Sequence, residues 1–153
     1  MIVLLGELLY EEKNPRITEL VEYGAKFSDI MTGKPVGPGG ARIDLHFVVD
    51  DMGSKGKLSG TGKGTISMNI HPDGITTVEI HETLTTKDGE NILVKGSGFS
   101  LPGDQPGTLR FKGAYNFHTS SEKYAWLNST LGVGEGAGNP LKGDVSVRVY
   151  SWN

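Results

Sequence analysis

The sequence predicts an all-β protein, a single antiparallel β-barrel of about eight strands in which residues 1–153 form one domain. Three observations support this fold class. The chain holds 23 glycines and 7 prolines, and a glycine inside a helix costs roughly 1 kcal/mol relative to alanine. Apolar and polar residues alternate in short runs, which is the period of a half-buried strand. Turn sequences separate these runs.

The first third of the chain contains one clear segment and one ambiguous segment. The apolar stretch Met1 to Tyr10 is taken as the opening strand. Residues 14–33 are compatible with two structures. Asn14 as an N-cap followed by Pro15 favours an amphipathic helix, whereas Thr18 to Phe27 is also compatible with a strand. Both alternatives stay open at this point.

From residue 42 onward the pattern is strand, turn, strand. The triplet Pro72-Asp73-Gly74 predicts a tight turn, because proline presets φ near −65° and glycine accepts a positive φ. The pair Asp88-Gly89 between two alternating runs predicts a hairpin. The predicted strands are 42–49, 65–71, 76–86, 92–99, 109–118, 124–133 and a terminal strand marked by Val145, Val147 and Val149.

Composition excludes several classes of function. The formal net charge of −3 offers no positive field for nucleic acid or anionic lipid. Without cysteine the chain forms neither disulfides nor zinc–thiolate sites. The apolar run Ile2 to Leu5 is too short for a signal peptide or a membrane span. We therefore expect a cytoplasmic protein that binds neither nucleic acid nor membrane and needs no cofactor. Its oligomeric state stays open, a homo-oligomer included.

The Asp88-Gly89 pair sets the predicted register of the central hairpin. If these two residues form the whole turn, Glu82 lies across from Lys95 and His81 lies across from Gly96. Paired residues share one face of a sheet, so Glu82 and Lys95 form a cross-strand ion pair worth roughly 0.2–1 kcal/mol. The sequence thus explains Glu82 as a surface residue without a chemical role.

Glu79 and His81 are the predicted catalytic residues. They lie two residues apart on one strand face, and the same register places Gly98 and Gly96 across from them, which leaves space for a substrate. Two interpretations follow. In one, a pocket encloses this face and Glu79 or His81 moves a proton. In the other, the apolar face of the hairpin is the core and the polar face lies in solvent.

An aromatic hairpin around residues 119–123 is the predicted ligand-binding wall. Its ring-bearing residues pair across two strands, Phe117 with Tyr124 and Tyr115 with Trp126. The row ends at Asn128, an amide that would orient a ligand, with Gly113 opposite. A different loop length would exchange the faces. The alternative is that the rings are packed core and that Asn128 bonds to backbone.

Asp44 and His46 complete the predicted ligand-binding residues, because they repeat the acid–histidine spacing of Glu79 and His81. If the two pairs converged, they would offer a mixed histidine and carboxylate metal site. Nothing in the sequence shows that their faces meet. No metal is therefore predicted.

Four groups of residues resemble a known family. The most specific is Tyr124-Ala125-Trp126-Leu127-Asn128, and the others lie around it and upstream, namely Thr130-Leu131 with Gly132-Val133-Gly134, Pro72-Asp73-Gly74 with Asp88-Gly89, and Gly40-Ala41-Arg42-Ile43-Asp44. Together they resemble the bacterial family of unknown function DUF3237 over residues 17–150. The resemblance implies a small barrel similar in shape to lipocalin-like and allene-oxide-cyclase-like barrels, and it implies no known reaction. Where family members often carry an Asp and an Arg two residues apart, this chain has Glu79 and His81.

The sequence therefore predicts a barrel that binds a small organic molecule, apolar or aromatic, in its interior or mouth. The enzyme hypothesis is a cofactor-independent isomerase, cyclase or lyase that works by acid–base catalysis. The alternatives are a barrel that only binds such a ligand and a structural barrel with a filled interior. The direction of the Glu79 and His81 face, and an open or filled interior, would distinguish them.

Overall fold

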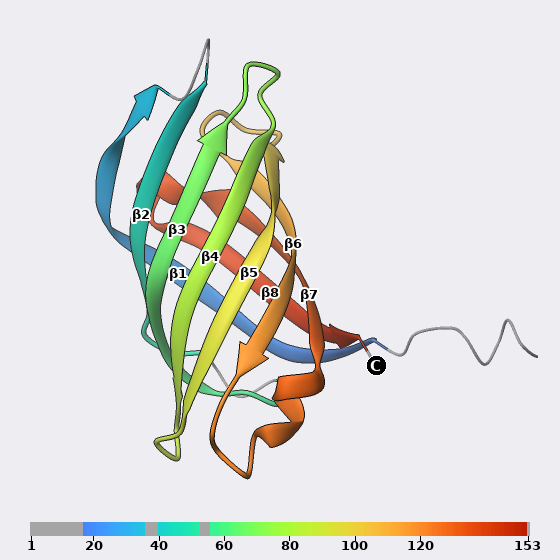
Figure 1. Ribbon diagram of the computed structural model, residues 1–153. Coiled ribbons are helices and arrows are strands. Elements are labelled where there is room, and N and C mark those ends of the chain that lie inside the picture. Colours follow the sequence, from blue (N-terminus) through green and yellow to red (C-terminus); the bar gives the residue numbers. More distant parts are fainter. Residues whose placement is uncertain (1–16, 36–39, 53–55, 153) are drawn as a thin grey trace, which may run out of the picture.

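Eight antiparallel strands wind into a barrel in the computed structural model, which describes residues 17–35, 40–52 and 56–152 (Figure 1). None of the helices in the described part of the chain is long and apolar enough to cross a membrane. The strands and the two short 3-10 helices are β1 (Ile17–Pro35), β2 (Ala41–Val49), β3 (Gly60–Ile70), β4 (Thr76–Thr86), β5 (Asn91–Pro102), β6 (Leu109–His118), η1 (Ala125–Ser129), β7 (Leu131–Asn139), η2 (Pro140–Lys142) and β8 (Asp144–Trp152).

Strand β1 closes the barrel because it pairs with two partners in succession. Residues 17–25 pair with β8, and residues 26–35 pair with β2. A register shift between Glu19 and Val21 marks an irregularity of the kind that bends a strand. Each other strand pairs with its sequence neighbours, so the strand order is β1 to β8 around the ring.

The ambiguous segment 14–33 is a strand where the structure describes it, because β1 begins at Ile17. The helix alternative is therefore wrong. Pairing with β8 and β2 satisfies the backbone of this segment through tertiary contacts that local helix signals do not include. The predicted opening strand Met1 to Tyr10 lies outside the described residues, and β1 completes the count of eight.

Alternation along β4 separates the core from the surface. Val78 and Ile80 are buried, whereas Glu79 and His81 between them are exposed. Pairing about the Pro72–Gly74 turn predicts that Ile66 lies across from Ile80 and Met68 across from Val78, and the β3–β4 ladder confirms both pairs. Gly74 has the positive φ that the turn requires, +85°. The apolar face of this hairpin is therefore the barrel interior.

The register predicted for the β4–β5 hairpin is wrong by one residue. His81 pairs with Lys95, and Glu82 pairs with Val94. The turn is longer than Asp88-Gly89 because the backbone N–H of Thr86 donates to the carbonyl of Glu90. A three-residue loop therefore replaces the two-residue turn. The slip changes which residues share a face, so the ion pair between Glu82 and Lys95 is not formed.

The strand predicted over 124–133 is also wrong in its first half. The chain forms η1 there, and β7 begins only at Leu131. Asn128 explains the difference, since its side-chain oxygen accepts from the Thr119 N–H at 2.8 Å and its amide donates to the Thr119 carbonyl at 3.0 Å. These two bonds close the segment into a compact loop. Tyr115 consequently pairs with Gly132 instead of Trp126.

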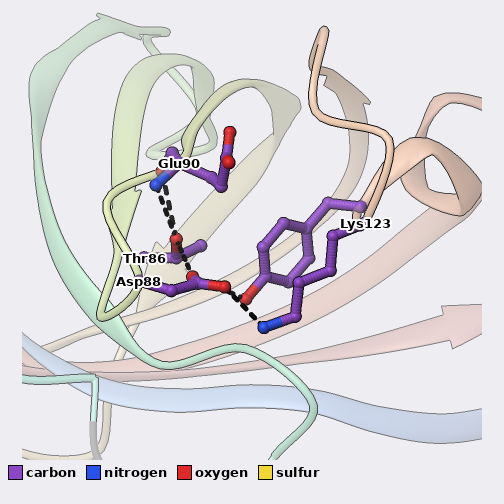
Figure 2. Close-up of polar contacts among 5 residues, drawn as sticks. Thr86, Asp88, Glu90 and Lys123 are labelled. Atoms are coloured by element: carbon purple, nitrogen blue, oxygen red, sulfur yellow. Dashed lines mark hydrogen bonds and ion pairs between the residues drawn. The ribbon is translucent and has the colours of Figure 1, made fainter.

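The segment 119–130 covers one end of the barrel, and we refer to it as the cap (Figure 1). Leu127 of the cap is fully buried. Figure 2 shows how the cap is held to the β4–β5 turn: the Lys123 ammonium pairs with Asp88, and Asp88 also accepts from Thr86. The Tyr124 hydroxyl donates to the same carboxylate at 3.0 Å. The cap therefore closes this end through both apolar and polar contacts.

Candidate functional site

The barrel interior contains a cavity of about 80 Å³. Its lining includes Leu109 at the start of β6, Pro140 after β7 and Val145 at the start of β8. These strand ends lie opposite the cap, which connects the other ends of β6 and β7. The cavity therefore occupies the half of the barrel away from the cap, and its walls are almost entirely apolar.

The Tyr115 side chain lies against the two strands next to β6, because three glycines there leave room for it. A Cβ added at Gly96, Gly132 or Gly134 would lie 2.9, 2.9 or 2.4 Å from a Tyr115 carbon. These contacts are closer than real Cβ atoms approach, so only glycine fits at these positions without a shift. The neighbouring strands β5 and β7 thus fix the position of a ring that also lines the cavity.

Glu82 is a carboxyl group inside the barrel. It follows Val78 and Ile80 on the inward face of β4 and is only 5% exposed. The hydroxyl of Tyr23, which lines the cavity from β1, forms a hydrogen bond with this carboxyl. Burial raises the pKa of Glu82 from 4.5 to about 7, and the hydrogen bond from Tyr23 opposes part of that rise.

A glycine also makes room for the Glu82 carboxyl. A Cβ at Gly62 would lie 2.2 Å from Glu82 Oε1 and 2.9 Å from the Met52 methyl. Oε1 is buried and has no hydrogen-bond partner among the described residues. A buried carboxyl oxygen without a partner costs stability. Such a group is therefore a candidate for chemistry and not for structural support.

Burial also keeps the two tyrosines in their neutral form. Desolvation raises the pKa of Tyr23 and of Tyr115, and the nearby charge of Glu82 raises both further. Each phenol is therefore a hydrogen-bond donor at neutral pH. The Tyr115 hydroxyl and the Ser100 hydroxyl, which also borders the cavity, find no partner within the described part of the chain. We refer to Tyr23, Glu82 and Tyr115 as the interior triad.

The structure places only one of the predicted site residues in the interior. That residue is Tyr115. Glu79, His81 and His46 are exposed on the outer face, and Asp44 lies beside them, bound to Arg42. The glycines expected opposite Glu79 and His81 pair with inward-facing residues instead, because of the one-residue slip. This face therefore points out of the barrel and not into the cavity, and the catalytic role of Glu79 and His81 stays a prediction.

The other three predicted ligand-binding residues belong to the cap. Tyr124 is half-buried and donates to Asp88, while Trp126 is exposed and Lys57 lies over its ring at 5.6 Å. Asn128 holds the cap closed through the Thr119 backbone. The predicted aromatic wall does not form, since β6 pairs with the glycines of β7.

The two acid–histidine pairs share one outer face but do not converge. Ser67 of β3 pairs with both Asp44 and Glu79, and Thr65 of β3 pairs with both histidines. A whole strand therefore separates the two pairs, about 10 Å at ordinary strand spacing. Among the residues that the structure describes, no group of three His, Asp or Glu side chains is placed to hold a metal ion.

Sequence reasoning missed Tyr23 and Glu82. A signal for Glu82 was present, because it shares the parity of Val78, Ile80 and Leu84 along one strand. A carboxyl in an apolar series is unusual unless it has a function or a partner. No comparable signal marked Tyr23, because its segment was compatible with two structures.

The molecule is thus a small eight-stranded barrel with a mainly apolar interior cavity and a buried carboxyl. The chain belongs to the family of proteins of unknown function DUF3237, whose model matches residues 30–152. This agrees with the resemblance stated above. No curated protein sequence matches the chain.

Solved structures share the fold. A Clostridium acetobutylicum protein of unknown function has a TM-score of 0.77 at 18% identity, with 92% of this chain and 99% of that chain covered. An Acinetobacter baumannii protein described as β-barrel-like has a TM-score of 0.76 at 20% identity, with 92% and 97% covered. A protein described as an enzyme from Penicillium herquei has a TM-score of 0.59 at 23% identity, with 91% and 95% covered.

Proposed function

We propose that the barrel binds a small, largely apolar molecule in its cavity and that the interior triad performs acid–base chemistry on it. The reaction class is a cofactor-independent isomerisation, cyclisation or elimination. The observation that carries the proposal is Glu82, a buried carboxyl whose pKa of about 7 lies near neutral pH and whose Oε1 has no partner among the described residues.

Ligand binding follows from the cavity lining. Apolar walls favour a hydrocarbon or aromatic body. The hydroxyls of Tyr115 and Ser100, which find no partner among the described residues, favour an oxygen atom on that body, because each would gain a hydrogen bond. An enolisable ketone has both features. The lipocalin-like or allene-oxide-cyclase-like shape that the family resemblance implies would use the barrel interior in the same way.

The proposed path of proton transfer follows from the order in which the cavity, Tyr23 and Glu82 lie. Tyr23 borders the cavity and is hydrogen-bonded to Glu82 behind it. When Tyr23 gives its proton to the substrate oxygen, protonated Glu82 restores that proton through the same hydrogen bond. The Glu82 carboxylate formed by this relay then accepts the proton lost from the substrate carbon, through the Tyr23 hydroxyl, so that the ketone becomes its enol and both residues return to their starting state. The reverse transfer to another carbon completes the isomerisation, and no net proton is released. Tyr115 stabilises the negative charge that develops on the substrate oxygen.

The outward direction of Glu79 and His81 favours Glu82 for the catalytic role predicted from the sequence for those two residues. The competing function is a barrel that binds its ligand without chemistry. The two unpaired cavity hydroxyls favour this alternative equally, since they would orient a ligand whether or not it reacts.

Labelled methionine methyl groups allow a direct test of binding with cyclohex-2-enone as the probe. Met68 lines the cavity, so its methyl signal is expected to shift and saturate with added ketone. Tyr115→Phe is expected to weaken binding by about ten-fold, through the loss of one buried hydrogen bond. Tyr150→Phe is the matched control, because the Tyr150 hydroxyl bonds to the exposed Arg148 outside the cavity.

Deuterium incorporation into the same ketone in heavy water tests catalysis. The parent protein is expected to exchange the acidic C–H positions of the ketone faster than buffer does, and Glu82→Gln is expected to abolish the difference. Saturable binding without exchange would rule out the catalytic function and support the alternative, a barrel that binds its ligand without chemistry. If the Met68 signal does not respond to the ketone at all, the proposal fails and the barrel is structural.

A further inference from the structure

A second concave site lies on the outer face of the barrel. It is a groove of about 890 Å³ across strands β2 to β6, on the side of the sheet opposite the cavity. Its outward-facing basic side chains come from five positions on these strands. We refer to this site as the basic groove and define it by His46, Lys63, His81, Lys95 and His118.

The strand ladders place these side chains in two adjacent rows. In the first row His46, Thr65, His81, Lys95 and Asn116 pair in succession across β2 to β6. In the second row Val48, Lys63, Thr83, Leu93 and His118 do the same. Residues paired in this way point to the same face of the sheet. The groove therefore runs across the strands and not along them.

Basic side chains gather in the groove, on a lining that is otherwise mainly apolar. It gathers three of the four histidines of the chain with two lysines. Glu82 is the one acidic residue that borders it, and its carboxyl points into the barrel on the other side of the sheet. The neighbouring row outside the groove holds Asp44 and Glu79, and Asp44 is already bound to Arg42.

An exposed apolar side chain lies within the same groove. Leu93 is 54% exposed and stands in the second row between Thr83 and His118. A small inorganic anion makes no favourable contact with an exposed leucine, so Leu93 indicates a different kind of ligand. Basic groups around one exposed leucine are complementary to acidic groups around one apolar group.

We propose that the basic groove binds an extended acidic peptide segment of a partner protein, with one apolar side chain placed on Leu93. Five strands at ordinary spacing span about 19 Å, which is the length of roughly six extended residues. The charge of the rest of the chain favours a short segment over a nucleic acid. The formal net charge of −3 already includes Lys63 and Lys95, so the surface outside the groove repels a long polyanion.

Fluorescence anisotropy of a rhodamine-labelled hexapeptide, five glutamates and one leucine, tests this proposal on the full-length protein. Binding is expected to be saturable and to weaken with added salt. The double substitution Lys63→Gln with Lys95→Gln is expected to weaken it by about ten-fold or more. Lys112→Gln with Lys142→Gln is the matched control, since it removes the same charge at exposed positions outside the groove.

Three results would overturn the proposal. One is the absence of saturable binding by the parent protein. Another is an equal loss of affinity in both double variants, which would indicate a general charge effect. The third is tighter binding of a labelled six-nucleotide oligothymidylate than of the peptide. Because the cavity lies on the other face of the sheet, the ketone experiments remain independent of each of these results.

Discussion

The two halves of the barrel interior use the same strands in different ways. Toward the cap, Met52, Leu58, Ile92 and Leu127 are at most 1% exposed, and the polar groups of the cap find partners. Away from the cap the interior contains a cavity, and buried hydroxyls beside it have no partner among the described residues. Close packing and satisfied hydrogen bonds are typical of a half that maintains the fold, whereas open space and unsatisfied groups agree with the binding site proposed for the other half.

The largest expected effect comes from removing a side chain in the packed half. Leu127→Ala is expected to lower the free energy of unfolding by about 4 kcal/mol, because a fully buried leucine leaves a cavity that its neighbours do not fill. Urea denaturation measures this loss. A loss below about 1 kcal/mol, the usual size for a surface position, would show that the cap does not contribute to the packed half.

The border between the halves is sensitive to pH. Because the pKa of Glu82 rises from 4.5 to about 7 on folding, the folded protein retains a proton that the unfolded chain releases between these values. Glu82 therefore costs nothing below pH 4.5 and lowers stability increasingly as the pH rises through 7, by about 3 kcal/mol at pH 8.

The substitution Glu82→Gln removes this penalty. We expect the variant to match the parent near pH 4.5 and to exceed its free energy of unfolding by about 3 kcal/mol at pH 8. The Met52 methyl, close to Glu82, is expected to report the titration near pH 7 by NMR. Glu79→Gln is the control for an exposed carboxyl. If the free energies of unfolding of the parent and of Glu82→Gln depend on pH in the same way, the group that titrates on folding is not Glu82.

Two methionines sharpen the comparison between the halves. Met52 is 1% exposed in the packed half, and Met68 is 9% exposed beside the cavity. Met52→Ala is expected to cost about 3 kcal/mol and Met68→Ala about 2 kcal/mol, since one side of Met68 already lacks contacts. The difference in urea midpoints measures this contrast. A larger cost at Met68 would mean that the cavity half is the better packed one.

The smallest expected effect concerns the outer attachment of the cap. Lys123→Gln is expected to lower the urea midpoint slightly, because it removes the exposed ion pair with Asp88, and added salt is expected to reduce the difference. Lys87→Gln removes a neighbouring positive charge from the same turn and is the control. If both variants lose the same stability, the ion pair itself contributes nothing.

Sequence patterns predicted the parts of the fold that depend on local alternation. The strands 76–86 and 109–118 have the predicted bounds, and the β3–β4 register is confirmed. The hairpin at Asp88-Gly89 has one more loop residue than expected, because the Thr86 side chain accepts from the Glu90 N–H and extends the turn. A dipeptide signal does not contain that side-chain bond, and one residue of slip exchanged every predicted partner across the hairpin.

The candidate site was the least predictable part. Tyr115 was identified, but its neighbours depend on the bonds between Asn128 and Thr119, which hold β7 back until Leu131. Glu82 alternates in phase with the buried apolar residues of its strand, which indicates an inward position. It was assigned to the surface because the predicted hairpin register was wrong. Its partner Tyr23 comes from β1, and only closure of the barrel brings these two residues together.

The pairing of β1 with β8 has a kinetic consequence. The Ser151 hydroxyl donates to the Thr18 carbonyl across 133 residues of sequence. During synthesis this last ladder forms only after β8 has been made. Until then, the half of β1 that pairs with β8 has no partner strand. Contacts of such long sequence separation slow folding, because their loop-closure entropy is lost before they stabilise the chain. The final closure of the barrel is therefore the expected slow step of refolding.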